Sequence, residues 1–84
     1  MWKVEVWIKP VRRGGVILKP GGWRTVDPAD GFGPAKLSVL LHARKLGVAR
    51  ATKLKAEPDE VRGMQAMGHG QSFSYWTGSG GLVG

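Results

Sequence analysis

Ser38 and His42 are the residues of this chain whose types and spacing come closest to a catalytic pair. They are four residues apart, so on a helix they would lie on one face and could touch. A serine nucleophile also needs an oxyanion hole and a base that a third group orients. No acid lies close to the pair in sequence, so we interpret both side chains as part of a solvated helix face.

Gly31-Phe32-Gly33 is a second candidate, because it precedes a helical pattern that contains Lys36. The free N–H groups of a helix N-terminus can bind a phosphate. However, the dinucleotide-binding fingerprint requires a third glycine where this chain has Lys36, and the P-loop pattern is absent. A plain loop-to-helix junction is therefore the favoured interpretation.

Metal ligands and acid/base pairs are scarce in the sequence. The chain has no cysteine, and its two histidines, His42 and His69, do not have the spacing of a zinc-binding pair. The carboxylates are interpreted as stabilising groups at helix starts: Asp27, Asp30, Asp59 and Glu60. We therefore expect a protein without catalytic residues, metal or cofactor.

The element that must position most of these residues is a helix predicted over Pro34–Val48. Pro34 suits a first helical turn and Gly47 suits a helix end. Apolar residues occur on both sides of this helix: Leu37, Leu40, Leu41 and Val48 on one, and Ala35, Val39, Ala43 and Leu46 on the other. So wide an apolar arc needs cover from two directions, its own sheet and either the C-terminal arm or another subunit.

Strands and turns are predicted before the helix. Apolar Trp2, Val4, Val6 and Ile8 alternate with Lys3, Glu5, Trp7 and Lys9, which predicts a strand over Trp2–Lys9 with one buried face. Arg12-Arg13-Gly14-Gly15 and Pro20-Gly21-Gly22 predict turns. Short strands are expected at Val16–Lys19 and Trp23–Val26, which completes a three-stranded meander. Phe32 is expected to anchor the following loop in the core.

After the helix, Ala49–Ala56 is predicted as a fourth strand and Pro58–Met67 as a short second helix with Val61 and Met64 inward. The predicted fold is thus α+β: a three- to four-stranded antiparallel sheet packed on one main helix, with a short second helix. We expect a single small domain over 1–67 and an uncharged, Gly-rich arm over 68–84, in which Gln71–Thr77 is compatible with a strand.

The uncharged C-terminal arm supports the leading functional hypothesis, a non-enzymatic structural protein that docks on a larger assembly, such as a viral or phage particle, or forms a homo-oligomer. The residues expected to contact a neighbouring subunit are Phe73, Tyr75, Trp76, Leu82 and Val83. No apolar run reaches membrane-spanning length and the N-terminus is no signal peptide, so an intracellular or virion location is expected.

Net charge supports an alternative. Thirteen Lys and Arg residues against six Asp and Glu give +7, which favours an anionic partner such as nucleic acid or an acidic protein surface. Trp7 shares a strand face with lysines, as in proteins that stack bases and pair phosphates. The residues of this alternative are Lys3, Trp7, Lys9, Arg12, Arg13 and Arg24. A further alternative is an inhibitor of a host nucleic-acid enzyme complex.

Overall fold

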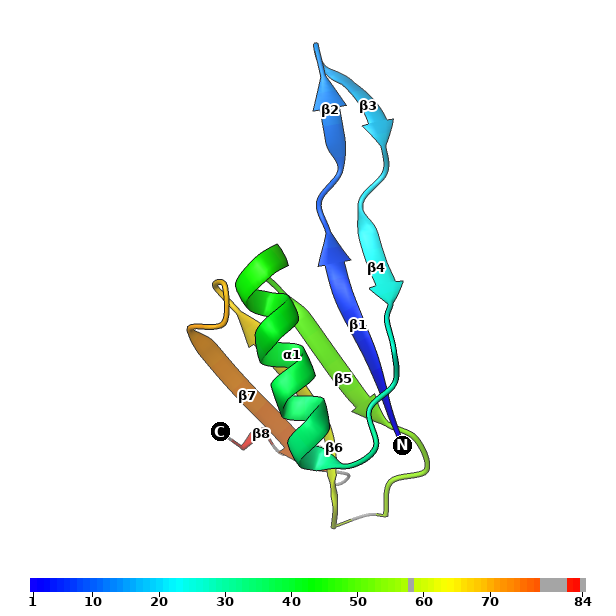
Figure 1. The fold of residues 1–84 in the computed structure, drawn as a ribbon, viewed down its shortest axis with the longest axis vertical. Helices are drawn as coiled ribbons and strands as arrows, with labels where there is room; N and C mark the ends of the chain where they lie inside the picture. Colours follow the sequence, from blue (N-terminus) through cyan, green and yellow to red (C-terminus); the bar gives the residue numbers. More distant parts are fainter. Residues whose placement is uncertain (58, 78–81, 84) are drawn as a thin grey trace.

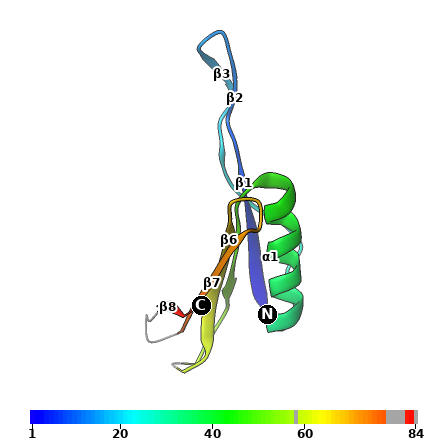
Figure 2. The ribbon, with the colours of Figure 1, turned by 90° about the vertical axis from the view of Figure 1, so that its left-hand side faces the viewer.

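The computed structural model describes residues 1–57 and 59–77 and the backbone of 82–83. One helix packs on one face of an antiparallel sheet, and a hairpin projects from the sheet (Figures 1 and 2). This confirms the predicted α+β class. The elements are β1 Trp2–Ile8, β2 Val11–Arg13, β3 Val16–Lys19, β4 Gly22–Thr25, α1 Phe32–Leu46, β5 Ala49–Lys53, β6 Val61–Met67, β7 Ser72–Thr77 and β8 Leu82–Val83.

The sheet has the order β4-β1-β5-β6-β7, and the two-residue β8 pairs with β7 at its edge. All of these pairings are antiparallel. The predicted strand after the helix is confirmed as β5, and it lies beside β1, with Val4 opposite Ala51. The first strand is therefore central in the sheet rather than at its edge.

The core lies between this sheet and α1. Trp2, Val4 and Val6 are buried, as the alternation in the first strand predicts. They pack with small side chains of β5 and β6 and with the inward side of the helix: Ala49, Ala51, Met64, Ala66, Ala35, Val39 and Ala43. Many of these residues are alanines, whose small side chains allow a helix to approach a sheet closely.

The predicted three-stranded meander is wrong, because the N-terminal segments form one long hairpin. Arg13 pairs with Val16, and Gly14 and Gly15 form the two-residue turn with φ angles of 59° and 80°. The tight Gly-Gly turn is thus confirmed. Pro20-Gly21-Gly22 does not reverse the chain, since β3 and β4 follow each other in the same direction along one side of this hairpin, opposite β2 and β1 (Figure 1).

Prolines explain why the hairpin splits into two ladders. Pro10 has no N–H to donate, so the pairing of β1 with β4 stops at Ile8. Gly21 lies opposite, where an added Cβ would be 2.6 Å from the carbonyl oxygen of Ile8. The outer ladder of β2 and β3 projects beyond the body and gives the molecule a length of 48 Å against widths of 23 and 22 Å.

The predicted second helix is also wrong: Val61–Met67 is the strand β6, which lies between β5 and β7. Pro58 lies outside the described residues. The register shifts between Val61 and Gly63, so Arg62 is an extra residue in a β-bulge. The bulge turns Val61 and Met64 to the same side, although they are three residues apart. That spacing imitates a helix in the sequence. Glu60 therefore starts no helix and instead forms an ion pair with Lys53.

The main helix begins two residues earlier than predicted and ends at Leu46. Gly31 occupies the N-cap position and no side chain caps the helix, so Asp30 is not the capping residue that its place before the helix suggests. Phe32 is the first helical residue and is 39% exposed, so the expectation that it anchors the loop in the core is wrong. Its ring makes T-shaped contacts with Trp2 and Tyr75. In the described part of the chain, no helix has the length and apolar character needed to cross a membrane.

Gly47 ends the helix as predicted, with φ at +100° and its N–H donating to the carbonyl of Ala43 at 2.7 Å. Replacing Gly47 with alanine should lower the free energy of unfolding by about 1–2 kcal/mol, because a side chain disfavours this backbone conformation. Urea denaturation followed by circular dichroism measures the change. Gly33→Ala is the matched control: it lies in the first helical turn with no atom within 4 Å of the added Cβ. Equal destabilisation by both changes would contradict this explanation.

The segment predicted as a C-terminal arm contributes two strands to the sheet: β7 pairs with β6, and β8 pairs with β7 at the sheet edge. The strand compatible with Gln71–Thr77 is confirmed as β7, in which Phe73 lies opposite Ala66. Phe73 and Tyr75 pack against the core on the α1 side of the sheet. Deleting residues 71–84 would therefore remove β7 from the sheet. Loss of partner binding in such a truncation could reflect loss of the fold, so the truncation does not test whether this segment docks on a partner.

Candidate nucleic-acid interface

The face of the sheet opposite α1 carries side chains that no described helix covers (Figure 2). Pairing registers place these residues on it in rows across the strands. We call this surface the open face, and it consists of Lys3, Glu5, Trp7, Trp23, Thr25, Arg50, Thr52, Gln65, Ser74 and Trp76. Three of the four tryptophans of the chain lie here, and the fourth, Trp2, is buried in the core.

A cluster of four side chains forms at the β4 side of the open face. Trp7 and Trp23 are directly opposite each other and meet edge to face, with ring centroids 5.5 Å apart. The guanidinium carbon of Arg50 lies 3.7 Å from the centroid of the Trp23 ring. Arg50 also donates from Nε to Glu5 at 3.2 Å. Contacts of this kind are each worth about 0.5–1 kcal/mol at partly exposed sites, so together they fix the guanidinium over the sheet.

This cluster assigns different roles to its two indoles. Trp23 has one ring face occupied by Arg50, so it has less free surface for a ligand. Trp7 contacts Trp23 at an edge-to-face angle of 69° and is partly exposed. Trp7 is therefore the better stacking surface of the pair.

Trp76 provides a second aromatic surface at the other side of the open face. Its strand β7 pairs with β6 so that Trp76 is opposite Gly63. A Cβ built on Gly63 would lie only 2.2 Å from Cζ2 of Trp76. The indole thus lies directly over the glycine backbone, and only a residue without a side chain permits this position.

The projecting hairpin adds positive charge at the end of β1 where Trp7 lies. We call residues 9–21 the arm, and every residue of it is exposed. Its charged residues are all basic: Lys9, Arg12, Arg13 and Lys19. Arg24 follows on β4, but it is opposite Val6 and so lies on the α1 side of the sheet.

The structure therefore brings together some of the residues predicted from sequence and separates others. Lys3 and Trp7 share the open face, whereas Lys9, Arg12 and Arg13 lie on the arm. Of the predicted partner-binding residues, Trp76 lies on the open face and Phe73 and Tyr75 on the opposite side. Leu82 and Val83 pair with β7, and their side chains lie outside the described residues.

Sequence reasoning missed Trp23 and Arg50 as members of the interface. Both follow from pairing: Trp23 is opposite Trp7, and Arg50 is opposite Glu5. A signal existed in Ala49–Lys53, where small residues alternate with Arg50 and Thr52. It becomes informative only once this strand is known to lie beside the first one.

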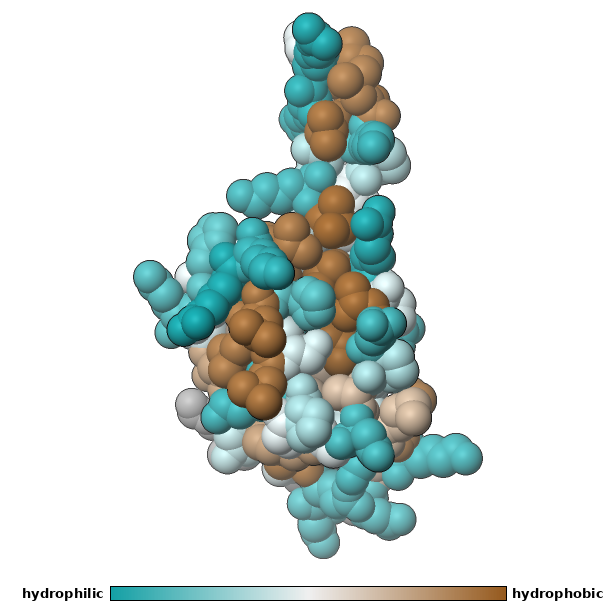
Figure 3. All heavy atoms as spheres, viewed as in Figure 1, coloured by the Kyte–Doolittle hydropathy of each residue, from teal (hydrophilic) through white to brown (hydrophobic). Residues whose placement is uncertain are grey.

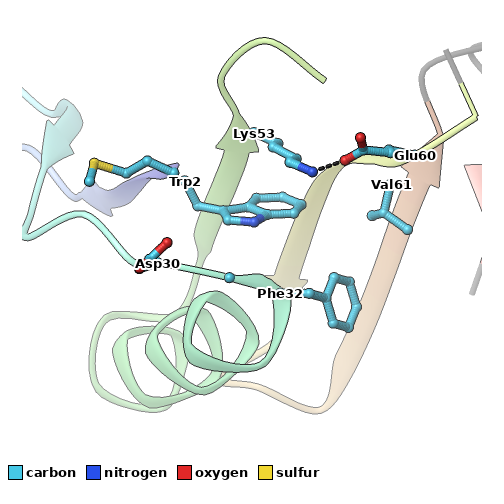
Figure 4. A pocket seen from close by; sticks show the side chains of 8 residues that line it. Trp2, Asp30, Phe32, Lys53, Glu60 and Val61 are labelled. Carbon is cyan, nitrogen blue, oxygen red and sulfur yellow. Dashed lines mark ion pairs between the residues drawn. The ribbon is translucent and has the colours of Figure 1, made fainter. Parts of the chain in front are cut away.

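The hollow at the lower end of the sheet is a second place where polar groups gather (Figure 4). It measures about 470 Å³, and the rings of Trp2 and Phe32 line it, 6.1 Å apart. Lys53 and Glu60 form their ion pair at its side. Among the described residues no Ser, Thr or His lines this hollow, and the charges of Lys53 and Glu60 are paired with each other.

The other predicted candidates do not form a catalytic arrangement in the part of the chain described. Ser38 and His42 line one shallow hollow on α1 together with leucines and Lys45, without an acid. Across residues 1–57, 59–77 and 82–83, no three His, Cys, Asp or Glu side chains gather where they could hold a metal ion.

Comparisons of the chain with protein-family models, with curated proteins and with solved structures find no match. The geometry of the open face and of the arm is therefore the basis for assigning a function.

Proposed function

We propose that this protein is a non-enzymatic nucleic-acid-binding module whose open face holds a single strand. The observation that carries the proposal is the set of indoles on a sheet face that no described helix covers, together with an arginine held over one of them. Bases of a single strand stack on aromatic rings, and Lys and Arg side chains pair with phosphates. The net charge of +7 favours an anionic partner of this kind.

The spacing of the two aromatic surfaces fits a short strand. Trp76 lies in the row of Lys3, four residues along β1 from Trp7 and three strands away. Strand rise and strand spacing then put Trp7 and Trp76 about 20 Å apart. At about 3.4 Å per stacked nucleotide, roughly six nucleotides reach from one to the other. Arg50 lies between these surfaces, where it can pair with the backbone of the strand.

Trp7→Ala and Trp76→Ala should each weaken the binding of a fluorescein-labelled oligothymidine of about 12 nucleotides by about tenfold. The reason is that a stacked base contributes about 1–3 kcal/mol to binding. Fluorescence anisotropy at low salt measures the affinity, and a duplex of equal length should bind more weakly to the open face.

The matched control is Phe32→Ala, which removes a partly exposed aromatic ring from the α1 side. It should leave the affinity unchanged. Circular dichroism spectra must show that all three variants are folded. If Phe32→Ala weakens binding as much as the tryptophan changes do, or if the wild-type chain binds no oligonucleotide at low salt, the proposal fails.

Docking on a larger protein assembly is the second candidate function, and one observation favours it. The arm exposes Val16, Ile17 and Leu18 to between 53% and 60%, although an isolated two-stranded hairpin is only marginally stable in water. Figure 3 shows apolar surface along this arm. Sedimentation velocity tests the case in which the partner is another copy of this chain. Self-association of the wild-type chain, and its loss in the double variant Ile17→Ser with Leu18→Ser, would support docking through the arm.

A further inference from the structure

The outward side of α1 is an apolar surface that the described residues leave exposed. Leu37 is 65% exposed and Leu41 is 56% exposed, whereas Ala35, Val39 and Ala43 on the inward side are buried. The helix faces the viewer in Figures 1 and 3, and apolar surface lies over it between hydrophilic side chains. The C-terminal strands do not cover this side, since β7 lies in the sheet beside β6.

Two hollows flank the ridge that Leu37 and Leu41 form. One, of about 260 Å³, lies between the ridge and the β6–β7 turn and is lined by Leu40, Arg44 and Gly70. The other, of about 470 Å³, lies on the far side with Pro34, Ser38, His42 and Lys45. A ridge of residues four apart between two grooves is the surface that a second helix packs against. Leucines at i and i+3 or i+4 of that helix would enter the hollows.

Charge identifies the chemistry of the helix that fits. Arg44 and Lys45 border the ridge at its C-terminal end, and no Asp or Glu occurs in the sequence between Asp30 and Glu57. Lys36 is held over the ring of Phe73, 4.9 Å from its centroid, and adds a cation beside the N-terminal part of the ridge. A second copy of this chain would bring equal charges together, which is unfavourable across an interface.

We infer that the outer side of α1 docks an acidic amphipathic helix of a partner protein. Leu37 and Leu41 supply the apolar contact, and Arg44 and Lys45 pair with carboxylates of the partner. This surface lies on the opposite side of the sheet from the open face, so a partner protein and a nucleic acid could bind together. The inference is independent of the proposed function, because it uses none of the residues of the open face or the arm.

A pair of designed helical peptides tests the inference directly. Both carry leucine at i, i+3, i+4 and i+7; one has glutamate on its polar side and the other has lysine at the same positions. The glutamate peptide should bind the 84-residue chain at least about tenfold more tightly at low salt. It should shift the ¹H–¹⁵N amide signals of Leu37, Leu41 and Arg44 rather than those of β1 or β4.

Variants separate the apolar from the charged contribution. Leu37→Ser with Leu41→Ser should weaken the glutamate peptide about tenfold or more, and both side chains are exposed enough for the fold to tolerate the change. Arg44→Glu with Lys45→Glu should reverse the preference toward the lysine peptide. Val16→Ser with Leu18→Ser is the matched control on the arm and should change neither affinity.

Several results would overturn the inference. Equal affinity for both peptides, or signal shifts confined to other elements, would exclude an acidic helix at this site. If oligothymidine shifts the α1 signals and displaces the glutamate peptide, the helix surface binds nucleic acid instead. If the wild-type chain self-associates in sedimentation experiments and Leu37→Ser with Leu41→Ser abolishes it, the occupant is a second copy.

Discussion

Replacing Gly63 with alanine should lower the free energy of unfolding by about 2–3 kcal/mol, although the change adds a single methyl group. The added Cβ would lie 2.2 to 2.8 Å from three atoms of the Trp76 indole, well inside van der Waals contact. The sheet backbone at Gly63 is fixed by pairing with Thr52 on one side and with Trp76 on the other. The indole must therefore leave its position and lose its packing on the sheet.

A double-mutant cycle isolates this contact. In a Trp76→Ala background, Gly63→Ala should have little cost or should even stabilise the strand, since alanine is less flexible than glycine when unfolded. Urea denaturation of the four proteins gives the coupling energy, and tryptophan emission of Gly63→Ala should shift to longer wavelength as the indole enters water. An equal cost of Gly63→Ala in both backgrounds would show that the indole is not the obstacle.

The same change connects the fold to the proposed function. If Trp76 stacks a base only while its indole lies over Gly63, Gly63→Ala should weaken oligothymidine binding as much as Trp76→Ala does. A stability change without any change in affinity would instead assign Trp76 to packing alone. Gly63 thus determines both whether β7 pairs closely with β6 and whether the open face presents its second aromatic surface.

Local patterns were sufficient to predict the elements whose side chains repeat regularly. The strict alternation from Trp2 to Ile8 fixes a strand with a buried face, and the 3.6-residue period with Gly47 at its end fixes α1. These signals are reliable because each is set by the geometry of one element. The sequence also shows that the apolar arc of α1 is wider than one sheet can cover, and in the structure Leu37 and Leu41 on that arc are exposed.

The elements that sequence reasoning missed are those whose form depends on distant partners. The bulge at Arg62 breaks the alternation of β6 and leaves Val61 and Met64 at helical spacing, so the local pattern favours the wrong structure. In the same way, Pro20-Gly21-Gly22 has the composition of a turn. It is instead a break in a strand, because Pro10 interrupts the ladder at the same level.

The candidate site could be predicted only in part for a related reason. Trp7 and Lys3 were found because they share one strand. Trp23, Arg50 and Trp76 join them from three other strands, and only the registers of β4, β5 and β7 bring them to one face. A one-residue slip in any register would turn these side chains to the other side of the sheet.

Removing the positive charge of the arm should have the largest effect on binding. If Lys9, Arg12, Arg13 and Lys19 each pair with a phosphate, exchanging all four for glutamine should reduce the slope of log affinity against log salt by about 3. This follows from about 0.7 counterions released per phosphate of a single strand, multiplied by four. Affinity for oligothymidine at low salt should fall by about a hundredfold or more, and both quantities come from anisotropy titrations across a salt series.

A control of equal net charge makes this result specific to the arm. Four exposed cations away from it, Lys36, Arg44, Lys45 and Lys55, can be exchanged for glutamine, so that both variants drop from +7 to +3. If binding depends only on the overall charge of the molecule, the two variants should lose the same slope and the same affinity. If the arm places its cations along the path of the strand, the control should keep most of the salt dependence. If both variants lose the same affinity and the same salt dependence, the cations of the arm do not contact the strand that the indoles bind. The arm would then be better explained as a docking element for protein.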